Sequence, residues 1–216
     1  EYINNNKFIN NISNIHDTLC YSARQGNIII VKWCLKNKTN IHHNNDYALL
    51  WSAANNYLEI VRLLLAAGAN VHANNMHILH SAIHNGHLNI SKLLIIAGAD
   101  IGIGINGSLL QNMENTCALR IAAERDHFEI VQFLLEQESL ASDPNNSILQ
   151  WAIKNNYLYI VRILIYKGHY IDYALYWASK NGINRIVKFL IDVGADRHDI
   201  NARALRVAHR EGHTNT

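Results

Sequence analysis

Four histidines fall close together in the sequence, at His77, His80, His84 and His87. On a helix, His80 and His84 would lie one turn apart on the same face, where two ring nitrogens could bind one zinc ion. No cysteine lies nearby to complete a tetrahedral set of ligands, and the chain has no His-Glu-x-x-His motif. We therefore favour structural or surface histidines, and a zinc-dependent enzyme centred on residues 77–87 stays as a distant alternative.

A second motif with possible chemistry is Gly102-x-Gly104-x-x-Gly107. Such a glycine pattern binds the pyrophosphate of a dinucleotide when a strand precedes it and a helix opens at its last glycine, inside a parallel βαβ unit. Here helical patterns lie on both sides of the motif. We therefore expect a loop or finger at this position, and no cofactor.

Other catalytic signatures are absent from the sequence. It contains neither Gly-x-Ser-x-Gly nor the phosphate-binding Gly-x-x-x-x-Gly-Lys-Ser/Thr motif. Carboxylates such as Glu59, Glu129 and Glu136 fall at helix positions expected to face solvent. We expect no catalytic residue, no bound metal and no enzymatic activity.

The elements that position these side chains repeat along the chain. In residues 47–71, Ile60, Leu63, Leu64 and Ala67 follow the i, i+3, i+4, i+7 spacing of an amphipathic helix. A shorter helical stripe precedes it, an Asn-Asn pair separates the two, and a glycine follows where a helix commonly ends. A single pair of helices cannot bury its apolar face alone, so it needs neighbours.

An isoleucine near the start of the second helix serves as the anchor for aligning the repeats. Eleven residues before each anchor stands a leucine, eight before it a small residue, and four before it Gly, Asn or Asp. We expect the first two columns to be buried, and the third to end the first helix in a left-handed conformation. The anchors are Ile30, Ile60, Ile90, Ile130, Ile160 and Ile186.

At this point the residues resemble a known family. Leu79 to Asp100, LHSAIHNGHLNISKLLIIAGAD, resembles an ankyrin repeat, whose familiar form runs TPLH-AA--GH-EIV-LLL--GAD. The resemblance covers nearly the whole chain after about residue 17 and implies an all-α solenoid of stacked helix-turn-helix repeats. The period is mostly 30 residues instead of about 33. Since the missing residues fall where the family places its β-hairpin, we expect shortened hairpin loops.

The 30-residue form, with tryptophans near the first helix, resembles the ankyrin arrays of large DNA viruses of amoebae, which suggests a viral protein in a host–virus interaction. The alignment also predicts the organisation of the chain. The predicted parts are an N-terminal capping helix or remnant repeat at 1–16, repeats at 17–46, 47–76, 77–116 with a loop insertion, 117–146, 147–172 and 173–202, and a truncated seventh repeat at 203–216.

Resemblance to the family implies a concave surface, formed by loop tips and first helices, that binds a partner protein. The positions five and six residues before each anchor isoleucine map to this surface, and their side chains share no common chemistry. We call the candidate contact residues at these positions the edge residues. Ile103 and Ile105 of the insertion are further candidates. The edge residues are Arg24, Gln25, Asn55, His84, Asn85, Glu124, Arg125, Lys154, Asn155, Lys180 and Asn181.

The charge of the chain limits the kinds of partner. A net charge of +2 and a pI near 8.5 are too mild to indicate nucleic acid, and no apolar run reaches the roughly 18 residues of a membrane span. Arginines gather in the C-terminal half, so we expect a mildly basic groove there that suits a partner with an acidic surface. These arginines are Arg120, Arg197, Arg203 and Arg206.

The cysteines indicate the compartment. Cys20, Cys34 and Cys117 are odd in number and form no Cys-x-x-Cys pair, which is typical of free thiols in a reducing compartment. We expect a cytoplasmic monomer, in the host cell cytoplasm if the protein is viral. The alternative function is a structural spacer that holds an effector module outside this chain.

Overall fold

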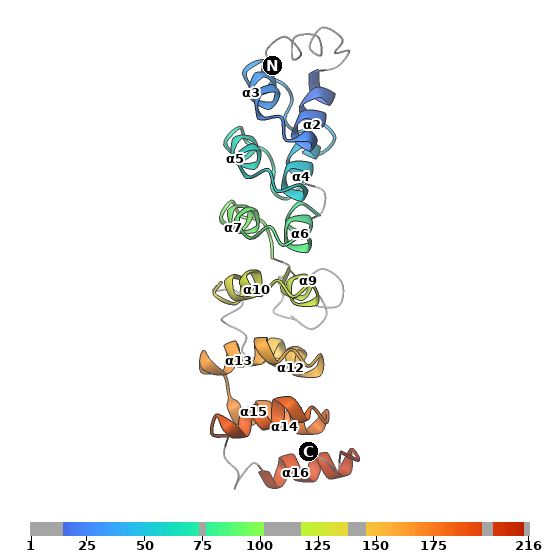
Figure 1. Cartoon of the computed structure of the whole chain (residues 1–216), viewed down its shortest axis with the longest axis vertical. Coiled ribbons are helices and arrows are strands. Elements are labelled where there is room, and N and C mark those ends of the chain that lie inside the picture. The colour runs from blue at the N-terminus through green and yellow to red at the C-terminus, as the bar shows by residue number, and fades with distance from the viewer. Residues whose placement is uncertain (1–14, 74–76, 102–117, 138–145, 196–200, 214–216) are drawn as a thin grey trace. The chain divides into compact units, whose positions relative to one another are not determined.

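The structure is a computed structural model that describes residues 15–73, 77–101, 118–137, 146–195 and 201–213. In these ranges every regular element is a helix, which confirms the predicted all-α fold (Figure 1). The chain divides into two compact units, Glu1–Leu134 and Leu135–Thr216, called unit 1 and unit 2 below. No helix in the described ranges is both long enough and apolar enough to cross a membrane.

Unit 1 is built from helix pairs that stack in two layers (Figure 1). The first helices α2, α4, α6 and α9 contact one another in sequence, and so do the second helices α3, α5 and α7. Each pair buries its apolar stripes against the next, as expected of a repeat architecture. The bounds are α2 Ile15–Gln25, α3 Ile28–Lys36, α4 Tyr47–Ala54, α5 Leu58–Ala66, α6 His77–His84, α7 Leu88–Ile96, α9 Ala118–Glu124 and α10 Phe128–Leu135.

Unit 2 repeats the same arrangement with fewer helices among its described residues. Here α14 contacts α12 on one side and α16 on the other, while α13 contacts α15. The loop before α14 is short, as its early position in the sequence predicts. The bounds are α12 Ser147–Lys154, α13 Leu158–Tyr166, α14 Ile171–Lys180, α15 Asn184–Asp192 and α16 Asn201–Arg210.

The core follows the predicted columns. The described leucines of the first column are at most 1% exposed, and the small residues of the second column are at most 3% exposed. Where that small residue is serine, its hydroxyl donates to a carbonyl one turn back: Ser22 to Leu19 and Ser52 to Leu49, both at 3.0 Å. Each buried hydroxyl is therefore satisfied, and the first helices can approach closely.

The third column confirms the predicted left-handed turn after each first helix. Every residue in it has a positive φ, including the non-glycine residues Asn56 at +65° and Asp126 at +55°. This conformation lets the chain reverse and start the second helix two residues later. The others are Gly26, Gly86, Asn156, Gly182 and Gly212.

Loops take the place of hairpins between repeats, and no strand occurs in the described ranges. In the loop before α4, the buried carboxylate of Asp46 accepts the backbone N–H of Asn70 at 3.0 Å and faces His42 Nδ1 at 3.1 Å. At the same register in unit 2, Asn146 Oδ1 contacts His169 Nδ1 at 3.1 Å. These side chains tie consecutive loops together.

Two sequence predictions fall on parts of the chain outside the described residues. They are the N-terminal capping segment, of which only the last residues enter α2, and the insertion after Asp100. The predicted repeat boundaries stay a prediction.

Candidate partner-binding face

The edge residues lie where each first helix ends and the turn to the second helix begins. Nine of the eleven are exposed, whereas Lys180 and Asn181 are half-buried. Ile103 and Ile105 lie outside the described residues. Within each unit the stacking of first helices brings equivalent edge residues to one side.

Bonds between repeats hold the backbone of this face in unit 1. His87 Nε2 lies 3.0 Å from the carbonyl oxygen of Ala54, and Asn85 Nδ2 donates to the same oxygen at 3.2 Å. One repeat later, His127 Nε2 lies 3.1 Å from the carbonyl oxygen of His84. His87 therefore has the structural role that the sequence favoured, because it bonds the backbone of the preceding repeat.

Two histidines of the cluster, His84 and His87, form contacts between repeats. The His84 ring contacts the guanidinium of Arg125, a cation that disfavours a metal ion at the same place. His77 is exposed and His80 is half-buried. Across the described ranges, no three His, Cys, Asp or Glu side chains gather as they would around a metal.

Asparagines on this face close the ends of first helices, a role that the sequence columns did not reveal. Each side-chain amide donates to the carbonyl of a tryptophan four residues earlier, at 2.7–2.9 Å, and so adds a second bond to a carbonyl that already accepts the backbone N–H of the same asparagine. The recurrence of Trp-x-x-x-Asn is the signal that could have shown it. The pairs are Asn55 with Trp51, Asn155 with Trp151 and Asn181 with Trp177.

Two edge cations lie over tryptophan rings. The guanidinium carbon of Arg24 is 4.3 Å from the ring centre of Trp51 in the next repeat, and Lys180 Nζ is 4.7 Å from that of Trp177. Tyr21, in the same column as these tryptophans, is 55% exposed, whereas Trp51, Trp151 and Trp177 are half-buried.

Some charged residues of this face form ion pairs with carboxylates, and others do not. In unit 1, Glu124 accepts a 2.6 Å bond from Arg120 Nε, which neutralises both side chains. In unit 2, no described carboxylate forms an ion pair with Lys154 or Lys180. Of the other arginines expected to make a basic groove, Arg203 and Arg206 are exposed on α16, and residue 197 lies outside the described ranges.

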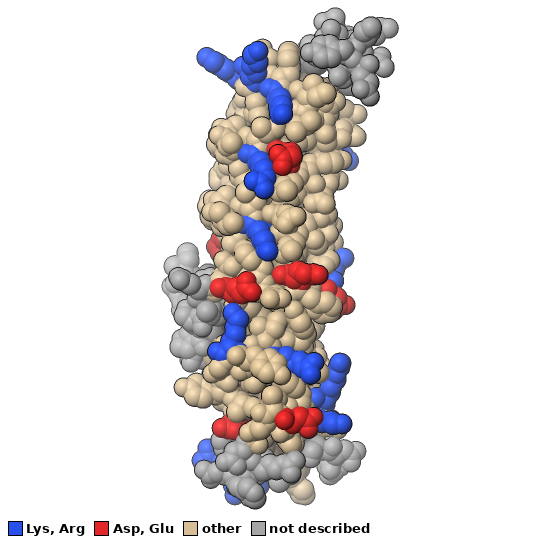
Figure 2. All heavy atoms as spheres, turned by 60° about the vertical axis from the view of Figure 1, so that its left-hand side comes forward, with Lys and Arg blue, Asp and Glu red and all other residues tan. Residues whose placement is uncertain are grey.

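On the side of the second helices, Lys and Arg stand apart, with Asp and Glu between some of them (Figure 2). Some of these cations pack on aromatic rings of the next repeat. Lys92 Nζ lies 5.1 Å from the ring centre of Phe133, and the Arg162 guanidinium lies 5.1 Å from that of Phe189. These contacts join neighbouring second helices.

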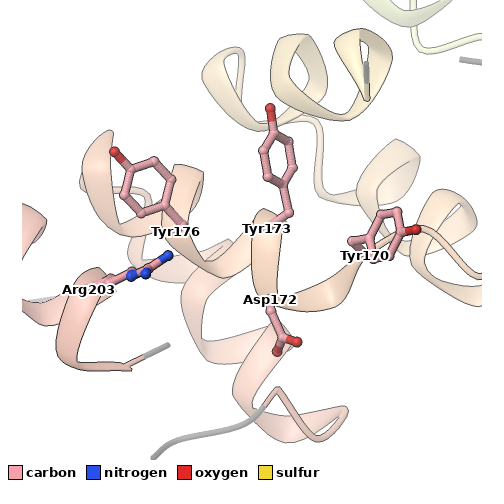
Figure 3. Close-up of a pocket in the computed structure, with 5 residues that line it drawn as sticks. All are labelled: Tyr170, Asp172, Tyr173, Tyr176 and Arg203. Carbon is pink, nitrogen blue, oxygen red and sulfur yellow. The ribbon is translucent and has the colours of Figure 1, made fainter. Parts of the chain in front are cut away.

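A pocket of about 610 Å³ opens on unit 2, lined by Tyr170, Asp172, Tyr173 and Tyr176 from the start of α14 and by Arg203 from α16 (Figure 3). None of these residues was among the edge residues. The signal in the sequence is compositional, because six of the ten tyrosines fall between residues 157 and 176.

Two cysteines in unit 1 are free thiols, Cys20 half-buried and Cys34 fully buried. Burial raises the pKa of each to about 11, so both are neutral and weakly nucleophilic at neutral pH. Neither is suited to act as a catalytic nucleophile.

The chain is similar to a known family of repeat proteins. A family model described as ankyrin repeats, in three copies, matches residues 19–105 and 103–173. No curated protein matches the chain.

Proposed function

The chain belongs to the ankyrin-repeat family, since that family model covers well over half of it, and we propose that it is a protein-interaction module. Ankyrin repeats generally mediate interactions between proteins. The observation that carries the proposal is a contrast between columns. Residues that pack the repeats are buried at fixed positions, whereas the edge residues beside them are mostly exposed and chemically varied.

The partner docks on the side of the edge residues, which the family resemblance makes concave. The bonds of His87 and His127 to preceding repeats support this, because they hold the backbone in place before a partner arrives, so that little entropy is lost on docking. Ile103 and Ile105 belong to the same proposal as contacts from the insertion.

An acidic surface on the partner fits the C-terminal half. Lys154 and Lys180 have no ion-paired carboxylate among the described residues, and Arg203 and Arg206 are exposed on α16 of the same unit. Attraction between such charges weakens as salt is added. The module acts as a monomer and binds no nucleic acid.

The proposed compartment is the cytoplasm, which suits the free thiols of Cys20 and Cys34. The 30-residue period suggests a viral origin, in which case the compartment is the host cell cytoplasm. The alternative is a spacer that positions an effector module outside this chain.

An affinity pull-down from cell lysate tests the module against the spacer. The baits are the wild-type chain and two double variants. Lys154→Glu/Lys180→Glu changes the proposed face. Arg185→Glu/Lys188→Glu is the control, with the same charge change at exposed positions of α15. We expect one protein to be captured by the wild type and the control and lost by the first variant. Folded baits that capture nothing would favour the spacer.

A further inference from the structure

Tyrosine is concentrated around the pocket of unit 2. Tyr170, Tyr173 and Tyr176 line it, and the side chain of Tyr170 is 74% exposed (Figure 3). Tyr and Arg are residue types in which the binding energy of protein interfaces is concentrated, because they combine large contact areas with polar groups. A volume of about 610 Å³ is in the range of pockets that take a ligand.

Neighbouring side chains hold two of these rings in place. Gln150 Nε2 of α12 donates to the hydroxyl of Tyr173. The rings of Tyr173 and Tyr176 each meet the ring of Trp177 edge-on, with centroids 6.2 Å and 5.9 Å apart. Rings that are already fixed lose little rotamer freedom when a ligand docks, so the pocket is preorganised.

Arg203 supplies the charge available in the pocket. Its side chain is exposed, and no described carboxylate forms an ion pair with it. Asp172, the other charged lining residue, extends from α14 in the opposite direction to Tyr173 (Figure 3) and already takes part in an interaction of its own. A ligand that matches Arg203 and the tyrosine rings would carry one negative charge beside an apolar group.

The balance of charge favours a carboxylate over a phosphate. A phosphorylated side chain carries about −1.5 to −2 at neutral pH, whereas the pocket offers one guanidinium with the carboxylate of Asp172 also in its lining. A carboxylate carries a single charge and matches the planar fork of arginine.

We propose that this pocket binds an Asp or Glu side chain of a linear partner segment, with Arg203 as its counter-charge and the tyrosine rings against an adjacent apolar residue. The inference rests on the proposed function. It places the anchor at the start of α14, at the opposite end of that helix from the edge residue Lys180.

A random-peptide phage library tests the pocket, with the full chain as bait. Enriched peptides are then labelled, and their Kd values are measured by fluorescence anisotropy on the wild type, Arg203→Glu and the control Arg185→Glu, an exposed cation on α15. We expect the enriched peptides to contain Asp or Glu beside an aromatic or branched apolar residue. Arg203→Glu should raise the Kd about tenfold or more, because it removes the charge pair with the peptide. Arg185→Glu should change the Kd by less than about twofold.

A second measurement uses the wild-type chain alone, in case Arg203→Glu fails to fold. Replacing the acidic residue of an enriched peptide by its amide should weaken binding to a similar degree. No enrichment, peptides without an acidic residue, or binding indifferent to both changes would overturn the proposal. A phosphotyrosine peptide that binds more tightly than its Glu counterpart would also contradict it.

The pocket and the proposed function fail in different ways. A lysate protein that is lost with Lys154→Glu/Lys180→Glu but retained with Arg203→Glu would leave the module intact and refute the pocket as its anchor. Folded baits that capture no lysate protein would refute the module itself.

Discussion

Leu149 and Lys154 lie on the same helix, α12, but one side chain is fully buried and the other is exposed. Leu149→Ala should lower the free energy of unfolding by about 2–5 kcal/mol, because it removes buried methyl groups and leaves a cavity. Lys154→Ala should change it by less than about 0.5 kcal/mol. Urea denaturation followed by circular dichroism measures both, and equal effects would mean that the repeat register is wrong.

The thiols of Cys20 and Cys34 should react slowly in the folded chain. Burial raises their pKa from 9.0 to about 11, so at pH 8 the folded chain holds roughly 100-fold less thiolate than the unfolded chain. A thiol reagent applied to a Cys117→Ser variant, native and in denaturant, measures the ratio. Reaction of the native protein at the denatured rate would show that the two thiols are accessible.

The same pKa shift has a consequence for stability at high pH. Between about pH 9 and pH 11 the unfolded chain releases protons from Cys20 and Cys34 that the folded chain retains. Because the folded state then binds more protons, this contribution to stability falls as pH rises through that window, and it is fully present below pH 9.

Glycines that follow helices differ in whether a ring of the next repeat covers them. A Cβ at Gly86 would lie 2.8 Å from Cε1 of His127, whose ring is held by its bond to His84, whereas nothing lies within 4 Å of a Cβ at Gly98. Both glycines have positive φ, +74° and +96°. Both alanine variants should therefore lose about 1 kcal/mol or more through backbone strain.

The steric clash should make Gly86→Ala the more damaging of the two, by about 1–3 kcal/mol as in other overpacked sites. Thermal or urea unfolding of the two variants in parallel measures the difference. An equal loss at both positions would show that the His127 ring moves aside at little cost.

The turn glycines also show which features of the helix ends could not be predicted from the sequence. The left-handed column was predictable, since Gly, Asn and Asp recur there at a fixed spacing. Which of these three residue types stands at a given position was not predictable. Gly26 and Gly182 lie under the rings of Tyr57 and His213, as Gly86 does under His127. Those rings come from the following repeat, so the space above these three glycines is limited by a tertiary contact that no local pattern contains.

For the whole molecule, the repeat pattern predicted the all-α fold and the buried columns because packing between repeats imposes the same residue types at the same positions. The candidate site was less predictable. Edge asparagines such as Asn55 looked like free surface but cap their own helices. The tyrosine pocket was missed because Tyr176 and Arg203 meet only when α14 packs against α16.

The stacking of repeats also determines how far the effect of a destabilising substitution extends along the chain. Among the described helices, each first helix makes its main contacts with the second helix of its own repeat and with adjacent first helices, so stability is roughly a sum of local terms and nearest-neighbour terms. Leu149→Ala should therefore speed amide hydrogen exchange in α12 and α14 far more than in α2 and α4 of unit 1. Hydrogen-exchange mass spectrometry resolves these segments. Equal acceleration throughout would mean that the whole chain opens as one cooperative body, and the additive treatment of its repeats would have to be abandoned.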